Sequence, residues 1–261
     1  MFRIHQHVVL PQSLTLKSSG LGLALSGAIN VTGGPFSHTK YELRQVHFHW
    51  GERDDFGSEH TVKGCSFAME VHFVHWNTDL YSSYEEAASE DGGLVIVAAF
   101  ANLDSRGNPA IEHICNYASA VRYKRQWEKI SVDIKQLLPN NIKKYWVYKG
   151  SMTVPPCYES VTWVIFNDNI TVSSRQLAQL RTLHNHSPND RPPADECQGY
   201  ITKNLRNLQP TGTRRVTAVE HVFTIGQIVQ YASLYDGSSV FTTSKDFTWT
   251  GGLQGSDEAD F

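Results

Sequence analysis

Hydrophobic positions in the stretches 41–50 and 67–77 are rich in β-branched and aromatic side chains. This pattern predicts two β-strands. The continuous apolar run 94–100 predicts a buried central strand. Residues 21–25, 144–149 and 160–166 predict three further strands, and residues 1–20 show no clear period.

Helical signals are short and lie between the predicted strands. Ser83 stands three residues before Glu86, which is the spacing of a capping box. Pro109 opens a second helix and a leucine repeat marks a third; their apolar stripes are Ile111, Ile114, Ala118 and Val121, and Leu177, Leu180 and Leu183. We therefore expect a mainly β (α+β) fold: a single domain on a large, mostly antiparallel central β-sheet with short peripheral helices.

Composition agrees with one globular domain and excludes some classes of partner. The chain has 261 residues, of which 40% are hydrophobic and 19% charged, and its net charge is −3. Such a balance gives no field that favours nucleic acid or a membrane surface. No run approaches the roughly 18 to 20 apolar residues of a membrane span. The start does not resemble a signal peptide, so we expect a cytoplasmic protein, or a secreted one if a signal peptide preceded a missing N-terminal part.

Three histidines have a spacing that suits a metal ion. His47 and His49 are two residues apart in a predicted strand, so both project from one face. If the next predicted strand is its neighbour, His72 completes a group of three imidazoles. Three histidines that leave one position open are typical of catalytic zinc, whereas structural zinc usually has a fourth protein ligand, often cysteine. His75 has the opposite strand parity to His72, and we expect it to have a structural packing role.

Six short strings, read together, identify a family. They are residues 45–51, 57–61, 70–77, 145–156, 161–163 and 204–210. In content and order they resemble the α-class carbonic anhydrases. The resemblance implies the fold of that family and a zinc enzyme that reversibly hydrates carbon dioxide.

The resemblance also implies a role for individual residues. The zinc ligands would be His47, His49 and His72, and Gln45, Glu70 and Asn204 would support them from the second sphere. Thr153 and Glu59 would be catalytic, the carboxylate of Glu59 accepting the proton of the Thr153 hydroxyl. The carbon dioxide pocket would be formed by Val74, Ile96, Met152, Val154, Val161 and Trp163. His60, beside Glu59, is predicted to be a buried hydrogen-bonding residue.

The implied reaction is attack of a zinc-bound hydroxide on carbon dioxide, which yields bicarbonate and a proton that must be exported. The implied cofactor is Zn²⁺, and the implied partners are carbon dioxide and bicarbonate, bound by a monomer. Val154 departs from the family's highly active members, which often carry threonine or histidine there.

The ends of the chain depart further from the family. Residues 1–20 lack the strings with which the family domain begins, and Leu21 matches the position of the proton-shuttle histidine. A leucine cannot relay protons. We therefore expect a divergent segment over 1–26, an N-terminally truncated carbonic anhydrase-like domain over 27–222, and a flexible tail over 223–261, where Gly, Ser and Thr dominate and the end is acidic.

Two alternatives to a fully active enzyme stay open. One is a catalytically silent, carbonic anhydrase-related binding module, although such relatives typically lose a zinc histidine and this chain keeps all three. The other is a zinc protein of reduced activity, limited by slow proton export and an incomplete fold. Zinc content distinguishes the silent binding module from the two zinc-binding hypotheses. Turnover, and its rescue by small buffers, distinguishes the fully active enzyme from the zinc protein of reduced activity.

Overall fold

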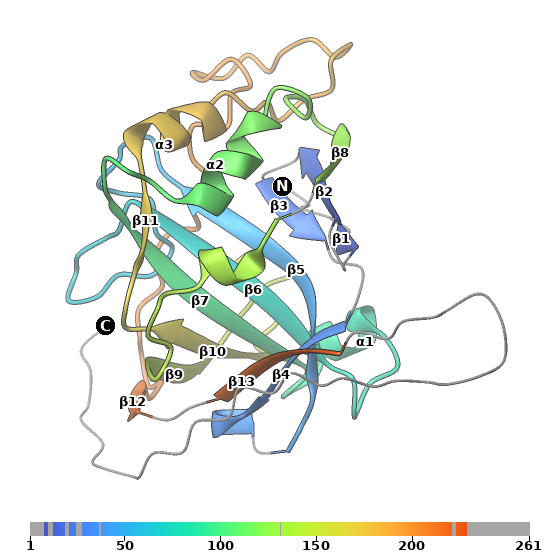
Figure 1. Ribbon diagram of the computed structural model, residues 1–261, viewed down its shortest axis with the longest axis vertical. Coiled ribbons are helices and arrows are strands. Elements are labelled where there is room, and N and C mark those ends of the chain that lie inside the picture. Colours follow the sequence, from blue (N-terminus) through green and yellow to red (C-terminus); the bar gives the residue numbers. More distant parts are fainter. Residues whose placement is uncertain are drawn as a thin grey trace, which may run out of the picture.

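A single curled sheet organises the computed structural model (Figure 1). The structure describes residues 8–9, 13–18, 21–24, 28–36, 38–130, 132–220 and 223–228. Within them, neighbouring strands follow the order β1-β2-β3-β5-β6-β7-β10-β9-β12, and β4, β8, β11 and β13 attach beside this path. The strands are β1 Val8–Val9, β2 Ser13–Ser18, β3 Leu21–Ala24, β4 Ala28–Gly33, β5 Tyr41–Trp50, β6 Met69–Asn77, β7 Leu94–Leu103, β8 Trp127–Ile130, β9 Lys144–Gly150, β10 Val161–Phe166, β11 Ile170–Val172, β12 Thr217–Glu220 and β13 Phe223–Ile228.

Most strand pairs are antiparallel, which confirms the expected sheet. Strands β10 and β11 pair with β7 in parallel, and each of the other pairs is antiparallel. The helices are short: α1 Tyr84–Ser89, α2 Pro109–Asn116, α3 Ser174–Leu180, and the 3₁₀ turns η1 Gly34–Phe36 and η2 Ile134–Leu137. Helices α2 and α3 lie together near one end of the sheet, and α1 lies far from them (Figure 1).

Local sequence explains where the helices begin. Ser83 caps α1 by accepting a hydrogen bond from the Glu86 amide, as the capping spacing predicts. The Glu86 carboxylate, however, accepts hydrogen bonds from Ser82, so the reciprocal half of the box is not formed. Helix α2 starts with Pro109 at its first turn and ends at Asn116. Ala118 and Val121 are buried as expected, but they lie beyond the end of the helix.

Both faces of the central strands are buried. Alternate residues of β5 and β6, such as Val46, Phe48 and Val71, enter a large core that also receives the buried sides of α2 and α3. The opposite face joins a second apolar cluster around Phe100, Val161 and Trp163. Burial on two sides explains why 94–100 is a continuous apolar run. Polar side chains on the second face therefore lie within apolar surroundings.

The chain ends contain more strand than their sequence indicates. Strands β1, β2 and β3 lie in the segment expected to diverge, and β2 pairs with β8 from much later in the chain. Residues Phe223–Ile228, assigned to a tail from composition, form β13 and pair antiparallel with β4. These pairings join distant segments, so no local period reveals them. The rest of the predicted tail, from 229 on, lies outside the described residues.

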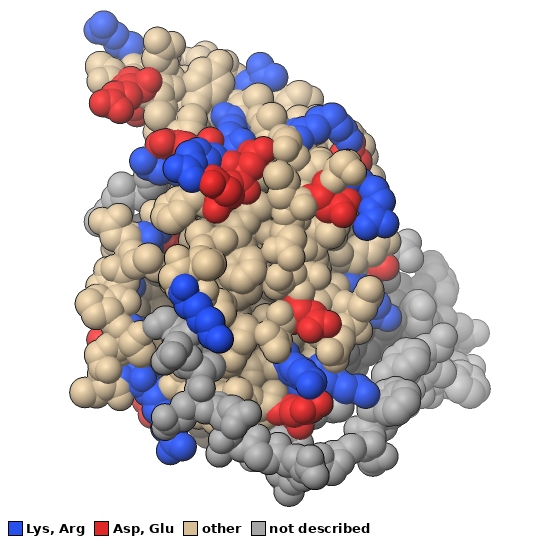
Figure 2. Space-filling view, turned by 90° about the vertical axis from the view of Figure 1, so that its left-hand side faces the viewer, with Lys and Arg blue, Asp and Glu red and all other residues tan. Residues whose placement is uncertain are grey.

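The surface carries charges of both signs. On the face in Figure 2, Lys and Arg side chains are interspersed with Asp and Glu, with broad uncharged areas between them. Ion pairs such as Arg181 to Asp54 and Lys203 to Glu52 contribute to this mixture. No helix among the described residues combines the length and the apolar character needed to cross a bilayer.

His75 allows a test of the burial of polar side chains in β6. Its side chain is 1% exposed, and burial lowers the pKa of His75 to about 4. The unfolded chain, in which the pKa of histidine is about 6.5, therefore binds more protons below pH 6.5. Stability should fall as the pH drops from 6.5 toward 4, and the His75 contribution should approach about 3 kcal/mol.

The measurement is urea unfolding at several pH values for the wild type and for His75→Gln. We expect the variant to lose this part of the acid dependence, so that the two profiles converge toward pH 4. The same substitution at exposed His38 is the control. Parallel profiles for wild type and His75→Gln would contradict the burial of a neutral imidazole.

Candidate metal centre

The register of β5 and β6 brings the three predicted histidines to one region of the sheet. His47 lies directly opposite His72, and His49 lies opposite Glu70. Because alternate residues share a face, His47, His49 and His72 leave the sheet on the same side. The ring centroids of His49 and His72 are 4.3 Å apart, and those of His47 and His49 are 6.4 Å apart.

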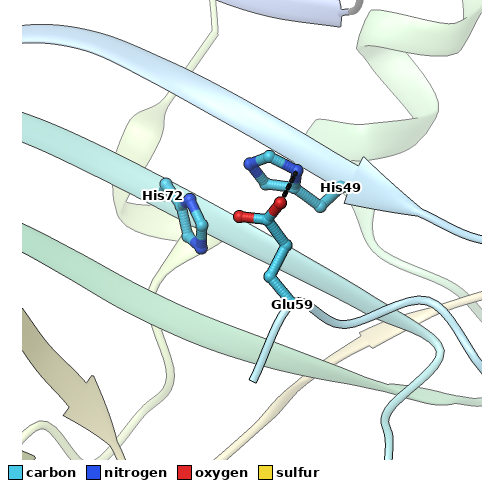
Figure 3. Close-up of side chains that lie close together, drawn as sticks. All are labelled: His49, Glu59 and His72. Carbon is cyan, nitrogen blue, oxygen red and sulfur yellow. Dashed lines mark ion pairs between the residues drawn. The ribbon is translucent and has the colours of Figure 1, made fainter. Parts of the chain in front are cut away.

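Two groups of potential metal-binding atoms occur among the described residues: one consists of His60, Glu70 and His72, and the other includes two of the predicted histidines and one carboxylate. One ligand atom each of His49, Glu59 and His72 lies within 4.8 Å of the others (Figure 3). His47 is beside this group and is not a member of it. The side chains of His49 and His72 are only 2% and 1% exposed, whereas His47 is 9% exposed. The structure thus brings two of the three predicted ligands into one tight group and leaves the third adjacent.

Hydrogen bonds select the ring nitrogen that each imidazole can offer. The Nε2–H of His72 donates to Glu70 Oε1 at 2.7 Å, which leaves the lone pair on Nδ1. The Nδ1–H of His49 donates to the Asn204 carbonyl at 3.2 Å, which leaves the lone pair on Nε2. His49 Nε2 is buried and has no hydrogen-bond partner among the described residues.

Burial, followed by the nearby His49, lowers the pKa of His72, although Glu70 opposes both effects. Burial therefore favours the neutral form of His72, which is the form that binds metals. Imidazole nitrogens are preferred ligands of Zn²⁺, and a buried nitrogen without a partner is a feature that a bound ion satisfies. The residues present fit the implied metal.

Glu70 connects the histidine face to the loop before β6. Its carboxylate accepts hydrogen bonds from the amides of Glu59 and His60 at 2.8 and 2.9 Å, and from the rings of His60 and His72. Burial alone would raise the pKa of Glu70, but His60 and His72 outweigh it and hold the pKa well below its usual range. Glu70 is therefore ionised and fixes His72 and the 59–60 backbone together.

His60 and Tyr148 extend this network through a hydrogen bond that the sequence did not predict. His60 Nε2 lies 2.6 Å from the Tyr148 hydroxyl, so a continuous chain of hydrogen bonds runs from His72 through Glu70 and His60 to Tyr148. His60 forms hydrogen bonds as predicted, and its side chain is largely but not completely buried, with 13% exposed. Tyr148, from strand β9, lies in the family string 145–156, but nothing in the local sequence indicates its contact with His60.

Asn204 supports the end of β5 as an additional strand would. Its side-chain oxygen accepts from the Trp50 amide and its side-chain nitrogen donates to the Phe48 carbonyl, each at 2.8 Å. Its own amide donates to the Trp50 carbonyl at 3.1 Å. These contacts hold the backbone on both sides of His49. Gln45 is buried on the face of His47, but within the described part of the chain its side chain makes no hydrogen bond.

The structure places Thr153 and Glu59 in one pocket without a hydrogen bond between them. The pocket has a volume of about 820 Å³, and Arg206 also lines it. Glu59 Oε1 accepts from the Arg206 amide at 2.9 Å and lies 3.6 Å from His49 Nδ1. Its other oxygen is buried and has no partner among the described residues. Glu59 Oε1 thus contacts the Arg206 amide and His49, and the hydrogen bond expected from the Thr153 hydroxyl stays a prediction.

The predicted apolar wall is assembled except at Val154. Val74, Ile96, Val161 and Trp163 belong to the second apolar cluster, and Met152 packs against it. Val154 is half-buried outside this cluster. The Trp163 ring lies 4.8 Å from that of His72, so the wall borders the histidine group. Gly150 permits this packing, because a Cβ there would lie 2.6 Å from the Tyr148 ring and 2.9 Å from Trp163.

A curled sheet with buried imidazoles on one face is an arrangement that could hold a metal ion, and comparison with known proteins identifies the family. The family described as eukaryotic-type carbonic anhydrase matches residues 2–220, so this chain belongs to the α-class carbonic anhydrases. The match includes most of the segment expected to diverge.

Individual relatives are similar over most of their length. Carbonic anhydrase 1 of Oryctolagus cuniculus is 43% identical over 187 residues, covering 71% of this chain and 76% of the relative. Carbonic anhydrase 1 of Monodelphis domestica is 40% identical over 187 residues, covering 71% and 68%. Carbonic anhydrase 7 of Homo sapiens is 40% identical over 189 residues, covering 72% and 68%.

The support that Asn204 gives to β5 can be tested by truncation. In Asn204→Ala, the Trp50 amide and the Phe48 carbonyl lose their partners. A buried polar group without a partner costs about 1–3 kcal/mol, so we expect a loss of roughly 2–4 kcal/mol in the free energy of unfolding. Urea denaturation measures the loss, and hydrogen exchange of the Trp50 amide locates it.

Asn207→Ala is the matched control for this experiment. Asn207 lies in the same segment, is exposed, and has no side-chain hydrogen bond to the described residues. It should change stability by less than about 0.5 kcal/mol. Equal effects of the two substitutions would refute the supporting role of Asn204.

Proposed function

We propose that this carbonic anhydrase is a zinc enzyme that reversibly hydrates carbon dioxide, with His47, His49 and His72 as its zinc ligands. The main support is that His49 and His72 are buried together, each with one ring nitrogen occupied by a second-sphere partner, and that His49 Nε2 has no hydrogen-bond partner among the described residues. Zinc bound there would make water nucleophilic at neutral pH; carbonic anhydrases are the reference case for this effect, with a pKa of bound water near 7.

The protein groups around the histidines have separate tasks in this proposal. Glu70 and the Asn204 carbonyl fix the orientation of His72 and His49 and increase their basicity as ligands. The apolar wall that includes Val161 and Trp163 provides a dry surface for carbon dioxide, which is itself apolar. Glu59 is a buried acceptor beside His49, and Thr153 lies in the same pocket, where its hydroxyl would orient the reacting oxygen.

A second candidate is a zinc-binding domain with weak turnover or none. Two observations favour it: His47 belongs to neither group of potential ligand atoms, and no hydrogen bond connects Thr153 to Glu59 within the described residues. In this alternative, the histidine face stabilises the sheet through its metal and the pocket serves for binding.

Carbon dioxide hydration by stopped flow, together with zinc analysis, separates the two candidates. We expect one zinc per chain and turnover above the uncatalysed rate, and we expect a chelator to abolish turnover and added zinc to restore it. His72→Ala should lose both zinc and turnover, the latter by roughly 100-fold or more, because the buried ligand that anchors the group is gone. His38→Gln, on the exposed surface, should retain both. One zinc per chain without turnover would support the binding domain, and the absence of zinc from a folded protein would overturn both candidates.

Proton export provides a second and independent test. Leu21, at the position matched to the shuttle histidine, has no group that titrates. We therefore expect imidazole buffer to raise kcat by roughly tenfold in a saturable way, since a positioned proton relay is worth that much or more. The ratio kcat/KM, which reports the carbon dioxide step, should stay constant. A kcat that is independent of imidazole would show that the chain has its own proton relay.

A further inference from the structure

A second pair of buried histidines lies far from the first site, in the segment after α3. Residues 183–186 lie between two other segments of the chain: His184 N donates to the Arg122 carbonyl at 2.7 Å, and Lys124 N donates to the His186 carbonyl at 2.9 Å. On the other side, Asn185 N donates to the Gly199 carbonyl at 2.9 Å. These backbone contacts hold the segment in place, and the rings of His184 and His186 lie side by side. The segment belongs to the orange loops beyond α3 in Figure 1.

Aromatic rings enclose the pair. The rings of His184 and His186 have centroids 5.0 Å apart. Tyr123 stacks on His184 at 4.7 Å with an interplanar angle of 10°, and Tyr200 contacts its ring at 4.2 Å. The two histidines are only 7% and 8% exposed, whereas Tyr200 is 44% exposed. The pair is therefore shielded but lies one side chain below the surface.

Hydrogen bonding leaves a nitrogen without a partner on each ring. The Nδ1–H of His186 donates to the Ser187 carbonyl at 3.0 Å, which places the lone pair of the neutral ring on Nε2. Both His186 Nε2 and His184 Nδ1 are buried and have no hydrogen-bond partner among the described residues. A buried polar atom without a partner is destabilising, so a ligand that satisfies both is favoured.

Protonation and nearby charge suit a cation at these nitrogens. Gly199 has a φ of +82°, and a Cβ there would lie 2.9 Å from His186 Nε2, so the absence of a side chain lets the backbone pack closely against this edge of the ring. Burial, followed by His186 and Arg122, lowers the pKa of His184, which is therefore neutral at pH 7. The carboxylate of Asp190 interacts electrostatically with His186 and with Arg125. Its negative charge offsets part of the positive charge of the arginines near the two histidines, Arg122 and Arg125.

We propose that His184 Nδ1 and His186 Nε2 form a second metal site, for an imidazole-preferring divalent cation such as Zn²⁺ or Ni²⁺. The site is separate from the histidines of β5 and β6 and does not depend on the proposed function. With two protein ligands and water in the remaining positions, it would exchange its ion faster than a three-histidine site. A bound ion would tie the 184–200 segment to Tyr123 and Tyr200.

The test is a Ni²⁺ titration of the full chain, loaded beforehand with one equivalent of Zn²⁺ and followed by amide NMR. Paramagnetic broadening should be confined at low Ni²⁺ to residues 122–124, 184–187 and 198–201. His186→Gln and His184→Gln should each weaken this binding by at least roughly tenfold, the lower end of what loss of even an outer-sphere partner costs. His38→Gln should bind as the wild type does.

The outcomes separate this site from other Ni²⁺ binding. Broadening located only near β5 and β6 or near exposed Cys65 would overturn the proposal, as would equal broadening in the wild type and in both histidine variants. If one variant fails to fold, the position of the broadening in the wild type and the result for the second variant still decide. The readout is independent of carbon dioxide hydration, so failure here and failure of the proposed function are distinguishable.

Discussion

The candidate centre depends on one buried carboxylate. Glu70 is fully buried at the middle of the sheet, where an unpaired negative charge would be prohibitively costly. Four donors compensate it: two backbone amides of the 59–60 loop and the rings of His60 and His72. The same bonds that make the charge tolerable also set the tautomer of His72 and position Glu59. The hydrogen bonds that stabilise the buried Glu70 charge are therefore the same ones that position the candidate ligands.

The rigid placement of the histidines also follows from their strands. A slip of one residue between β5 and β6 would move His47 and His49 away from His72 and turn Val46 and Phe48 out of the large core. Because both faces of these strands are buried, such a slip would displace large side chains on both faces of the sheet. The apolar packing on one face of the sheet thus specifies the positions of the polar groups on the other.

The sequence predicts the local parts of this arrangement well. The β-branched and aromatic residues of 41–50 and 67–77 indicate the strands, and the two-residue spacing of His47 and His49 indicates a shared face; the family resemblance supplies the further site residues. Contacts between distant segments were not predictable in this way. Three such contacts join residues whose local sequence does not indicate the partner. They are the hydrogen bond from the Arg206 amide to Glu59, the hydrogen bond between His60 and Tyr148, and the pairing of β13 with β4. The expected Thr153 contact concerns a hydroxyl in an irregular bend, where periodicity gives no information.

The support that Asn204 gives to β5 affects the order in which the chain can fold. Asn204 lies 154 residues after Trp50, and β7 obtains its parallel partner β10 only after a long connection. Closing such loops costs entropy before the contacts reward it, and topologies rich in long-range pairs fold slowly. On the ribosome, β5, β6 and β7 emerge as a block well before the segment that completes them. During that interval the end of β5 is an open edge, so this protein is most exposed to non-native strand pairing while the strands that carry the candidate metal ligands are already synthesised.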